Sequence, residues 1–168
     1  MQSGRSSARF ILLLITAVLG ISGTAFYVFY IKNRAAGNEA GSRILELKDT
    51  VSGKIYNRWT LEEGSEFSME FIHSVNMSPV RETFFVEADM IRLKSLRFYS
   101  YGAGIPSHLE ESWALSRDGD AMLITGFNSL FKEINFMAGT VSEYLLFING
   151  ETLILGRDGN TRLTLSLK

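Results

Sequence analysis

Apolar and polar residues alternate with period two through most of residues 43–168, and this alternation is the strongest constraint on the fold. Such a pattern is typical of β-strands that bury one face, and the closing stretch TRLTLSLK is a clear example. Turn-forming pairs separate the runs, and we expect hairpins at Asn149-Gly150, Asp118-Gly119 and Asp158-Gly159. Only Ser107–Leu115 suggests a short helical turn. We therefore predict an all-β domain, an antiparallel sandwich or barrel of about eight or nine strands.

The N-terminal part of the chain has a different character. Phe10–Ile31 carries no charge over 22 residues, which is roughly 33 Å of helix and long enough to cross a bilayer. A cleaved signal peptide has a shorter apolar region that ends in a small-x-small site, and here the only candidate, Gly23-Thr24-Ala25, lies inside the run. We predict one transmembrane helix in contact with membrane lipid. The expected organisation is a tail (1–9), the anchor (10–31), a linker (32–42) and the β domain (43–168).

The composition excludes several classes of function. The 168 residues include 17 basic and 18 acidic side chains, for a formal net charge of −1, whereas nucleic-acid-binding domains usually carry a basic excess. No nucleic-acid partner is therefore expected. The chain has no cysteine, which excludes disulfides, thiolate metal sites and cysteine nucleophiles. Any catalysis would depend on histidine and carboxylate side chains.

The stretch FIHSVNMSPVRE (71–82) holds one of the two histidines of the chain and predicts a hairpin with a four-residue connection at 76–79. Pairing Val75 with Val80 sets His73 opposite Glu82 and places the apolar side chains of both strands on one face. A second turn, at Ala88-Asp89, pairs Val86 with Ile91 and Phe84 with Leu93. The apolar phase then changes near Lys94-Ser95, which predicts a β-bulge beside Glu82.

The segment Ser100–Glu111 should leave the third strand at the same end of the sheet as the 76–79 connection. That end collects a cluster of candidate functional or structural residues: His73, Pro79, Glu82, Tyr101, Gly102, Gly104, Pro106 and Glu110. His73 and Glu82 could be a base with its orienting carboxylate, or a buried polar pair that closes the core. Glu110, Glu111 or His108 could complete a metal site, although no H-x-x-x-H or H-x-H spacing exists. The structural pair is favoured, so we predict no catalytic residue, no metal and no cofactor.

Three short motifs carry a family resemblance: HSV at 73–75, SPVRE at 78–82 and SYGAGIP at 100–106. Together with the Asn149-Gly150 hairpin they resemble the domain-of-unknown-function family numbered 1850, over roughly Leu45 to the C-terminus. Members are often encoded next to TRAP-type transporters of the TAXI class, which import small organic anions. The basic residues that flank the anchor are nearly balanced and do not orient it. The resemblance implies an N-terminus inside and a β domain on the extracytoplasmic side of a prokaryotic cytoplasmic membrane.

The function expected from this resemblance is a membrane-anchored, non-enzymatic accessory protein that assists a TAXI-type TRAP transporter in the uptake of small organic anions. Its partners would be the TRAP transporter membrane subunits or the solute-binding protein. One alternative is an extracytoplasmic module that binds a small ligand or a metal. A weaker alternative is an envelope hydrolase that relies on histidine and carboxylates.

Overall fold

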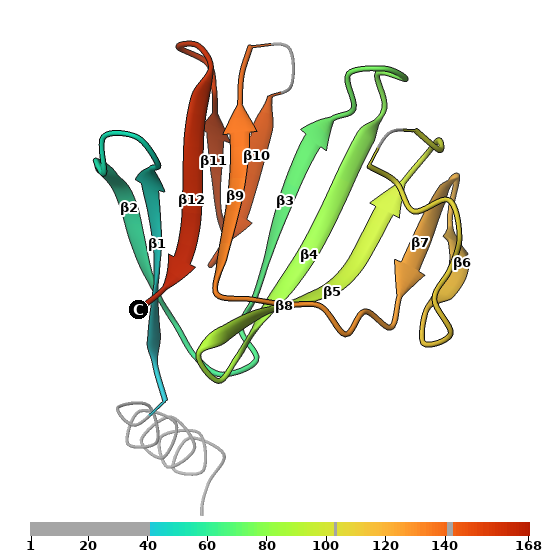
Figure 1. The fold of residues 1–168 in the computed structure, drawn as a ribbon, viewed down its shortest axis with the longest axis horizontal. Coiled ribbons are helices and arrows are strands. Elements are labelled where there is room, and N and C mark those ends of the chain that lie inside the picture. Colours follow the sequence, from blue (N-terminus) through green and yellow to red (C-terminus); the bar gives the residue numbers. More distant parts are fainter. Residues whose placement is uncertain (1–40, 103, 141–142) are drawn as a thin grey trace, which may run out of the picture. The chain divides into compact units, whose positions relative to one another are not determined.

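Two antiparallel sheets build the part of the chain that the structure, a computed structural model, describes: residues 41–102, 104–140 and 143–168 (Figure 1). Ser42–Lys168 forms one unit. The strands are β1 (Arg43–Asp49), β2 (Ile55–Leu61), β3 (Glu66–Ile72), β4 (Pro79–Glu87), β5 (Met90–Phe98), β6 (Ala114–Asp118), β7 (Ala121–Thr125), β8 (Leu130–Phe131), β9 (Glu133–Ala138), β10 (Tyr144–Ile148), β11 (Glu151–Leu155) and β12 (Thr161–Leu167). The predicted all-β, antiparallel fold is confirmed. Its strand number was predicted too low, partly because a two-residue strand such as β8 is too short to show a period.

The two sheets lie face to face around one main core. The short sheet has the order β2-β1-β12-β9, and the wide sheet has the order β11-β10-β3-β4-β5-β7-β6, with β8 paired to β5. Leu47 and Leu165 of the short sheet belong to the same buried cluster as Phe67, Phe84 and Leu146 of the wide sheet. The Phe67 and Phe84 rings stack at 5.3 Å. Two open sheets with a shared core make this domain a sandwich, an alternative that the sequence left open beside a barrel.

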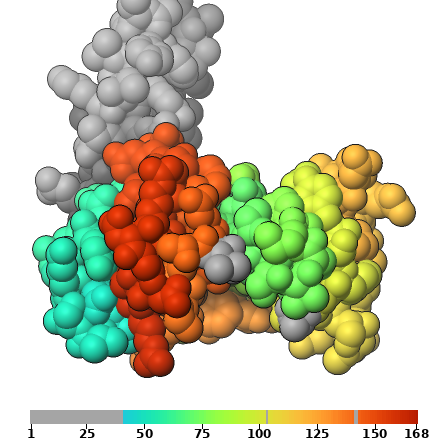
Figure 2. Space-filling view, turned by 90° about the horizontal axis from the view of Figure 1, so that it is seen from above, coloured from blue at the N-terminus to red at the C-terminus, as the bar shows by residue number. Residues whose placement is uncertain are grey.

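The wide sheet extends past the short one, as Figure 2 shows from above for its green-to-yellow part. A second buried cluster lies there, and loops cover it instead of strands. Val80, Phe98 and Ile124 come from the sheet, whereas Ile105 and Phe127 come from the segments that follow β5 and β7. Burial of these loop side chains holds the segment after β5 against the sheet, which positions the candidate site.

The turn predictions had mixed outcomes. Asn149 and Gly150 have φ angles of 50° and 78° and join β10 to β11, as a type I′ hairpin requires. Asp118-Gly119 likewise joins β6 to β7. Asp158-Gly159 was predicted wrongly: β11 pairs with β10 but β12 pairs with β1 and β9, so this turn carries the chain from the wide sheet to the short one. The Ser107–Leu115 helical turn was also wrong, since this segment forms turns and bends and then enters β6.

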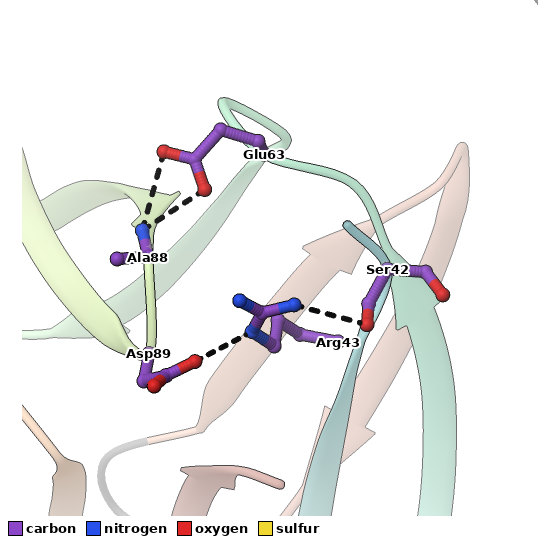
Figure 3. A network of polar contacts seen from close by, with 5 residues as sticks. All are labelled: Ser42, Arg43, Glu63, Ala88 and Asp89. Atoms are coloured by element: carbon purple, nitrogen blue, oxygen red, sulfur yellow. Dashed lines mark hydrogen bonds and ion pairs between the residues drawn. The ribbon is translucent and has the colours of Figure 1, made fainter. Parts of the chain in front are cut away.

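Polar contacts tie together the turns at one end of the sandwich (Figure 3). The Glu63 carboxylate, between β2 and β3, accepts the Ala88 N–H at 2.9 Å and 3.2 Å from its two oxygens. Ala88 lies in the β4–β5 turn with a φ of 52°. Arg43 Nε, at the start of β1, donates to the Asp89 carboxylate at 2.7 Å and so joins the two sheets at this end. These contacts fasten the end of the sandwich that holds the β2–β3 and β4–β5 turns. The β3–β4 and β5–β6 connections lie at the other end of the sandwich.

Strand β12 buries residues on both of its faces. Leu163 and Leu165 face the core as the alternation predicts, but Thr164 and Ser166 on the other face are only 2% and 4% exposed. The Thr164 hydroxyl has hydrogen-bond partners on both sides. Ser166 Oγ is buried and has no partner among the described residues. An unsatisfied buried hydroxyl is unfavourable by about 1–3 kcal/mol.

Replacing Ser166 with Ala should therefore raise the free energy of unfolding by about 1 kcal/mol, because the change removes a desolvated group that has no partner. Urea denaturation of the full-length protein measures this difference. The matched variant Thr164→Val removes a hydroxyl that is hydrogen-bonded, and it should lower the free energy of unfolding by about 1 kcal/mol. A Ser166→Ala protein as destabilised as Thr164→Val would contradict the prediction.

Candidate functional site

His73 is the first residue after β3 and organises the loop that follows. Its side chain is buried, with 6% of the residue exposed. Its backbone N–H donates to the Ser78 carbonyl at 2.9 Å, and its carbonyl accepts the Met77 N–H at 2.8 Å. The ring also takes part, since Nδ1 accepts the Val75 N–H at 3.3 Å. His73 thus holds the 73–78 loop through its backbone and its side chain.

Asn76 connects this loop to the segment that follows β5. Its Oδ1 accepts hydrogen bonds from the Ser78 hydroxyl at 2.9 Å and the Ser78 N–H at 3.4 Å. Its Nδ2 donates to the carbonyls of Ser100 and Tyr101, at 3.3 Å and 3.4 Å. These bonds use both ends of the amide, so one side chain sets the spacing of two loops.

Gly102 lies directly against the His73 ring. A Cβ atom built on Gly102 would lie 2.9 Å from His73 Cε1 and 3.0 Å from His73 Nε2, closer than side-chain atoms normally approach. The carbonyl of Gly102 accepts the Ile105 N–H at 3.0 Å, which closes a turn that contains Gly104 at a φ of 85°. Half-buried Pro106 follows. Gly102 of the SYGAGIP motif therefore places its backbone over the histidine, and Ile105 of the same motif packs in the second core cluster.

Apolar side chains are exposed on the outside of these two loops. Val75 is 76% exposed, Met77 63% and Tyr101 52%. We call these three residues the loop surface. Tyr101 packs its ring edge-on against Phe98 at 5.2 Å, and Met77 has a φ of 50°.

Two other residues of the predicted cluster lie outside the loop surface. Pro79 begins β4. Glu110 is exposed, and its backbone carbonyl accepts the Trp113 N–H at 3.0 Å.

The predicted cross-strand pair of His73 and Glu82 is wrong. β3 and β4 pair Phe71 with Val80 and Met69 with Glu82. Because His73 lies opposite Ser78 in the loop, it is four strand positions from Glu82, or about 13 Å along the sheet. The slip is four residues, an even number, so each side chain keeps its face and the apolar alternation is equally well satisfied. In the observed register Phe67 is paired with Phe84, and their rings stack. The predicted register would not pair these two residues, so the stacking distinguishes the two registers.

The second half of the register prediction is confirmed. Val86 pairs with Ile91 and Phe84 with Leu93. The pairing then shifts between Thr83 and Phe84, which leaves Lys94 as the additional residue of a bulge. The position of the bulge agrees with the change of apolar phase in the sequence.

Glu82 occupies a separate place, on the inner face of the wide sheet. It is paired with Met69 on one side and with Leu96 on the other, so it lies between the two core clusters. Burial raises the pKa of its carboxyl. Burial also raises the pKa of the Tyr144 hydroxyl, and the nearby Glu82 charge adds to this effect. No sequence signal revealed Tyr144, because β10 reaches β3 through a pairing distant in sequence.

Within residues 41–102, 104–140 and 143–168, no group of three or more His, Asp or Glu side chains is arranged to hold a metal ion. No helix in these ranges is long and apolar enough to cross a membrane. The predicted anchor, Phe10–Ile31, lies outside the described residues.

The profile of one protein family, Domain of unknown function (DUF1850), matches residues 67–155, just over half of the chain. The chain belongs to this family. The DUF1850 match runs from β3 to β11 and contains all three motifs and the Asn149-Gly150 hairpin, whereas β1, β2 and β12 lie outside it. The resemblance inferred from the motifs is therefore confirmed over a shorter range than expected. No curated protein and no solved structure matches the chain significantly.

Proposed function

We propose that this DUF1850 protein is a non-enzymatic accessory protein that binds a protein partner through the loop surface. The observation that carries the proposal is the contrast between exposed apolar side chains and the backbone beneath them. Val75, Met77 and Tyr101 are solvent-exposed, while His73 and Asn76 fasten their loops through hydrogen bonds. Apolar side chains held in place in this way lose little conformational entropy on binding, which favours association.

A role without catalysis agrees with the arrangement of the titratable groups. His73 uses Nδ1 to accept a backbone N–H, and its ring lies under Gly102. Glu82 is about 13 Å away along the sheet, too far to orient the imidazole as a catalytic carboxylate would. The two groups therefore do not form an acid–base pair.

The proposed setting is the extracytoplasmic side of a prokaryotic cytoplasmic membrane. Phe10–Ile31 would span the bilayer, because its charge-free length matches the apolar core. The proposed partners are the membrane subunits or the solute-binding protein of a TAXI-type TRAP transporter. This choice of partner rests on the family resemblance, and the loop surface supplies the means of contact.

Affinity capture of the tagged full-length protein from its own membranes tests the proposal. We expect TRAP transporter components to co-purify with the parent protein. A triple variant, Val75→Ser with Met77→Ser and Tyr101→Ser, should recover at least tenfold less of these transporter components than the parent protein does. The matched control is Val51→Ser with Leu115→Ser and Ile154→Ser, three apolar residues that are exposed elsewhere, and it should recover as much as the parent. Absence of transporter components from the parent sample, or equal recovery with both triple variants, would overturn the proposal.

A further inference from the structure

The outward face of the short sheet has an open hollow formed by β1, β9 and β12. Two of these strands, β1 and β12, lie outside the match to DUF1850. The volume of the hollow is about 490 Å³. Its polar lining residues are Lys48, Thr50, Glu133, Asn135, Arg162 and Thr164, and its apolar lining residues are Phe136, Met137 and Leu163. Thr164 is 2% exposed and lies at the bottom, because it is a short side chain between longer neighbours on both adjacent strands.

The hydrogen bonds across the floor have a fixed direction. Glu133 is a carboxylate and can only accept, so its Oε1 accepts a hydrogen bond from Asn135 Nδ2 at 3.0 Å. This orients the Asn135 amide and leaves Oδ1 to accept the Thr164 hydroxyl at 2.7 Å. Thr164 has one hydroxyl proton, so at 2.9 Å it must accept from Thr50. The proton of Thr50 is thereby committed, and the Thr50 oxygen can offer a ligand only lone pairs.

Two cations flank this chain of hydroxyls. Lys48 is the register partner of Thr164, and Arg162 precedes Thr164 by two residues and shares its face. Lys48 and Arg162 are therefore diagonal neighbours, roughly 7–8 Å apart at the backbone. Neither has an ion-pair partner among the residues that the structure describes. Adjacent like charges repel each other, and an anion between them would attract both and so outweigh their mutual repulsion.

We propose that the hollow binds a small 2-hydroxycarboxylate. The ammonium group of Lys48 and the guanidinium of Arg162 hold the carboxylate, for which the planar fork of Arg is well suited. The hydroxyl on the neighbouring carbon donates to the Thr50 oxygen, which matches the acceptor that the hydrogen-bond chain leaves open. A carboxylate without this donor forms only the charge interactions. This site is distinct from the loop surface, and it does not depend on the proposed transporter partner.

Isothermal titration calorimetry of the full-length protein with glycolate and with acetate measures the two affinities and so tests the site. Glycolate should bind about fivefold more tightly than acetate, the usual effect of one hydrogen bond. Lys48→Gln combined with Arg162→Gln should abolish the binding of both. Lys132→Gln combined with Arg157→Gln removes the same charge from exposed positions outside the hollow and should leave both affinities unchanged.

The variant Thr50→Val distinguishes a hydroxyl-reading site from a simple anion site. It should lower glycolate affinity to that of acetate and leave acetate affinity unchanged. The proposal is overturned if neither ligand binds the parent protein. It is also overturned if the control pair weakens binding as much as the hollow pair does, or if glycolate keeps its advantage over acetate in the Thr50→Val protein.

Discussion

Gly102→Ala is expected to lower the free energy of unfolding by about 2 kcal/mol, in the range typical of overpacking a well-filled interior. The new Cβ would lie 2.9 Å from a carbon of the His73 ring and 3.3 Å from Asn76 Nδ2. The ring cannot move away easily, because it is buried and Nδ1 holds the Val75 N–H. Displacing the 99–106 segment instead would stretch the Asn76 bonds to Ser100 and Tyr101. Thermal unfolding of the full-length protein measures the change.

A double-mutant cycle with His73→Ala identifies the clash as the cause. His73→Ala removes the ring that meets the new Cβ, so adding Gly102→Ala should then have little further effect. Gly104→Ala is the contrasting control: nothing lies within 4 Å of its Cβ, but its φ of 85° strains any residue other than glycine. It should destabilise by about 1 kcal/mol whether or not His73 is present. An equal effect of Gly102→Ala in both backgrounds would rule out the steric explanation.

Gly102→Ala should also weaken partner capture, because Tyr101 and the Asn76-bound carbonyls lie next to the displaced backbone. The outcome separates two roles for the glycine. Loss of stability with full partner recovery would mean that the loop surface tolerates displacement, against the proposed rigid presentation. Loss of both agrees with it.

The sequence predicted those features of the fold that depend on short stretches. The Asn149-Gly150 hairpin follows from two residues that tolerate a positive φ, and the bulge at Lys94 follows from one change of apolar phase. The pairing of Phe84 with Leu93 across a tight turn was correct for the same reason. In each case a local preference and the burial of one face select the same register.

Pairings between distant segments could not be predicted. β12 returns to β1 and β10 returns to β3, and nothing in the turn signals specifies these partners. The β3–β4 register failed because an even slip keeps every apolar side chain on the core face, so periodicity cannot distinguish the two arrangements. The hairpin contains a six-residue loop instead of four, closed by His73 with Ser78. A polar residue that bonds its own loop has no periodic signature.

The expected gathering of residues at one end of the wide sheet depends on strand direction, and the error in register does not affect it. His73, Tyr101 and Gly102 do come together, because β3 and β5 run in the same direction and end at the same side of the wide sheet. Glu82 does not join them, since its position depends on the absolute register and not on strand direction. Thr50 and Thr164 were missed altogether, since they are joined through the β1–β12 pairing.

Glu82→Gln is expected to stabilise the protein at pH 7, and the effect should disappear in acid. Burial raises the pKa of the Glu82 carboxyl in the folded protein, so the folded state binds this proton more tightly than the unfolded state does. The parent protein therefore loses stability as pH rises from the unfolded value, about 4.3, to the raised folded value, and above that the loss is constant. A tenfold difference in proton affinity corresponds to about 1.4 kcal/mol. Glutamine has a similar shape and no charge, so it avoids this loss.

The test compares the free energies of unfolding of the full-length parent and Glu82→Gln proteins between pH 3.5 and pH 8. Their difference should be near zero at the acid end and should grow in favour of Glu82→Gln toward neutral pH. Asp49, whose pKa is lowered by hydrogen bonds from Ser52, and Glu87, whose pKa is lowered by its hydrogen bond with Arg92, give slopes of the opposite sign. These slopes occur in both proteins and cancel. The control variant Glu111→Gln, at an exposed position, should change the free energy of unfolding by less than about 0.5 kcal/mol over the whole pH range. A Glu82→Gln protein that is less stable than the parent at pH 7 would contradict the prediction. The ionised Glu82 carboxylate would then be stabilised, and not destabilised, by its surroundings between the two core clusters.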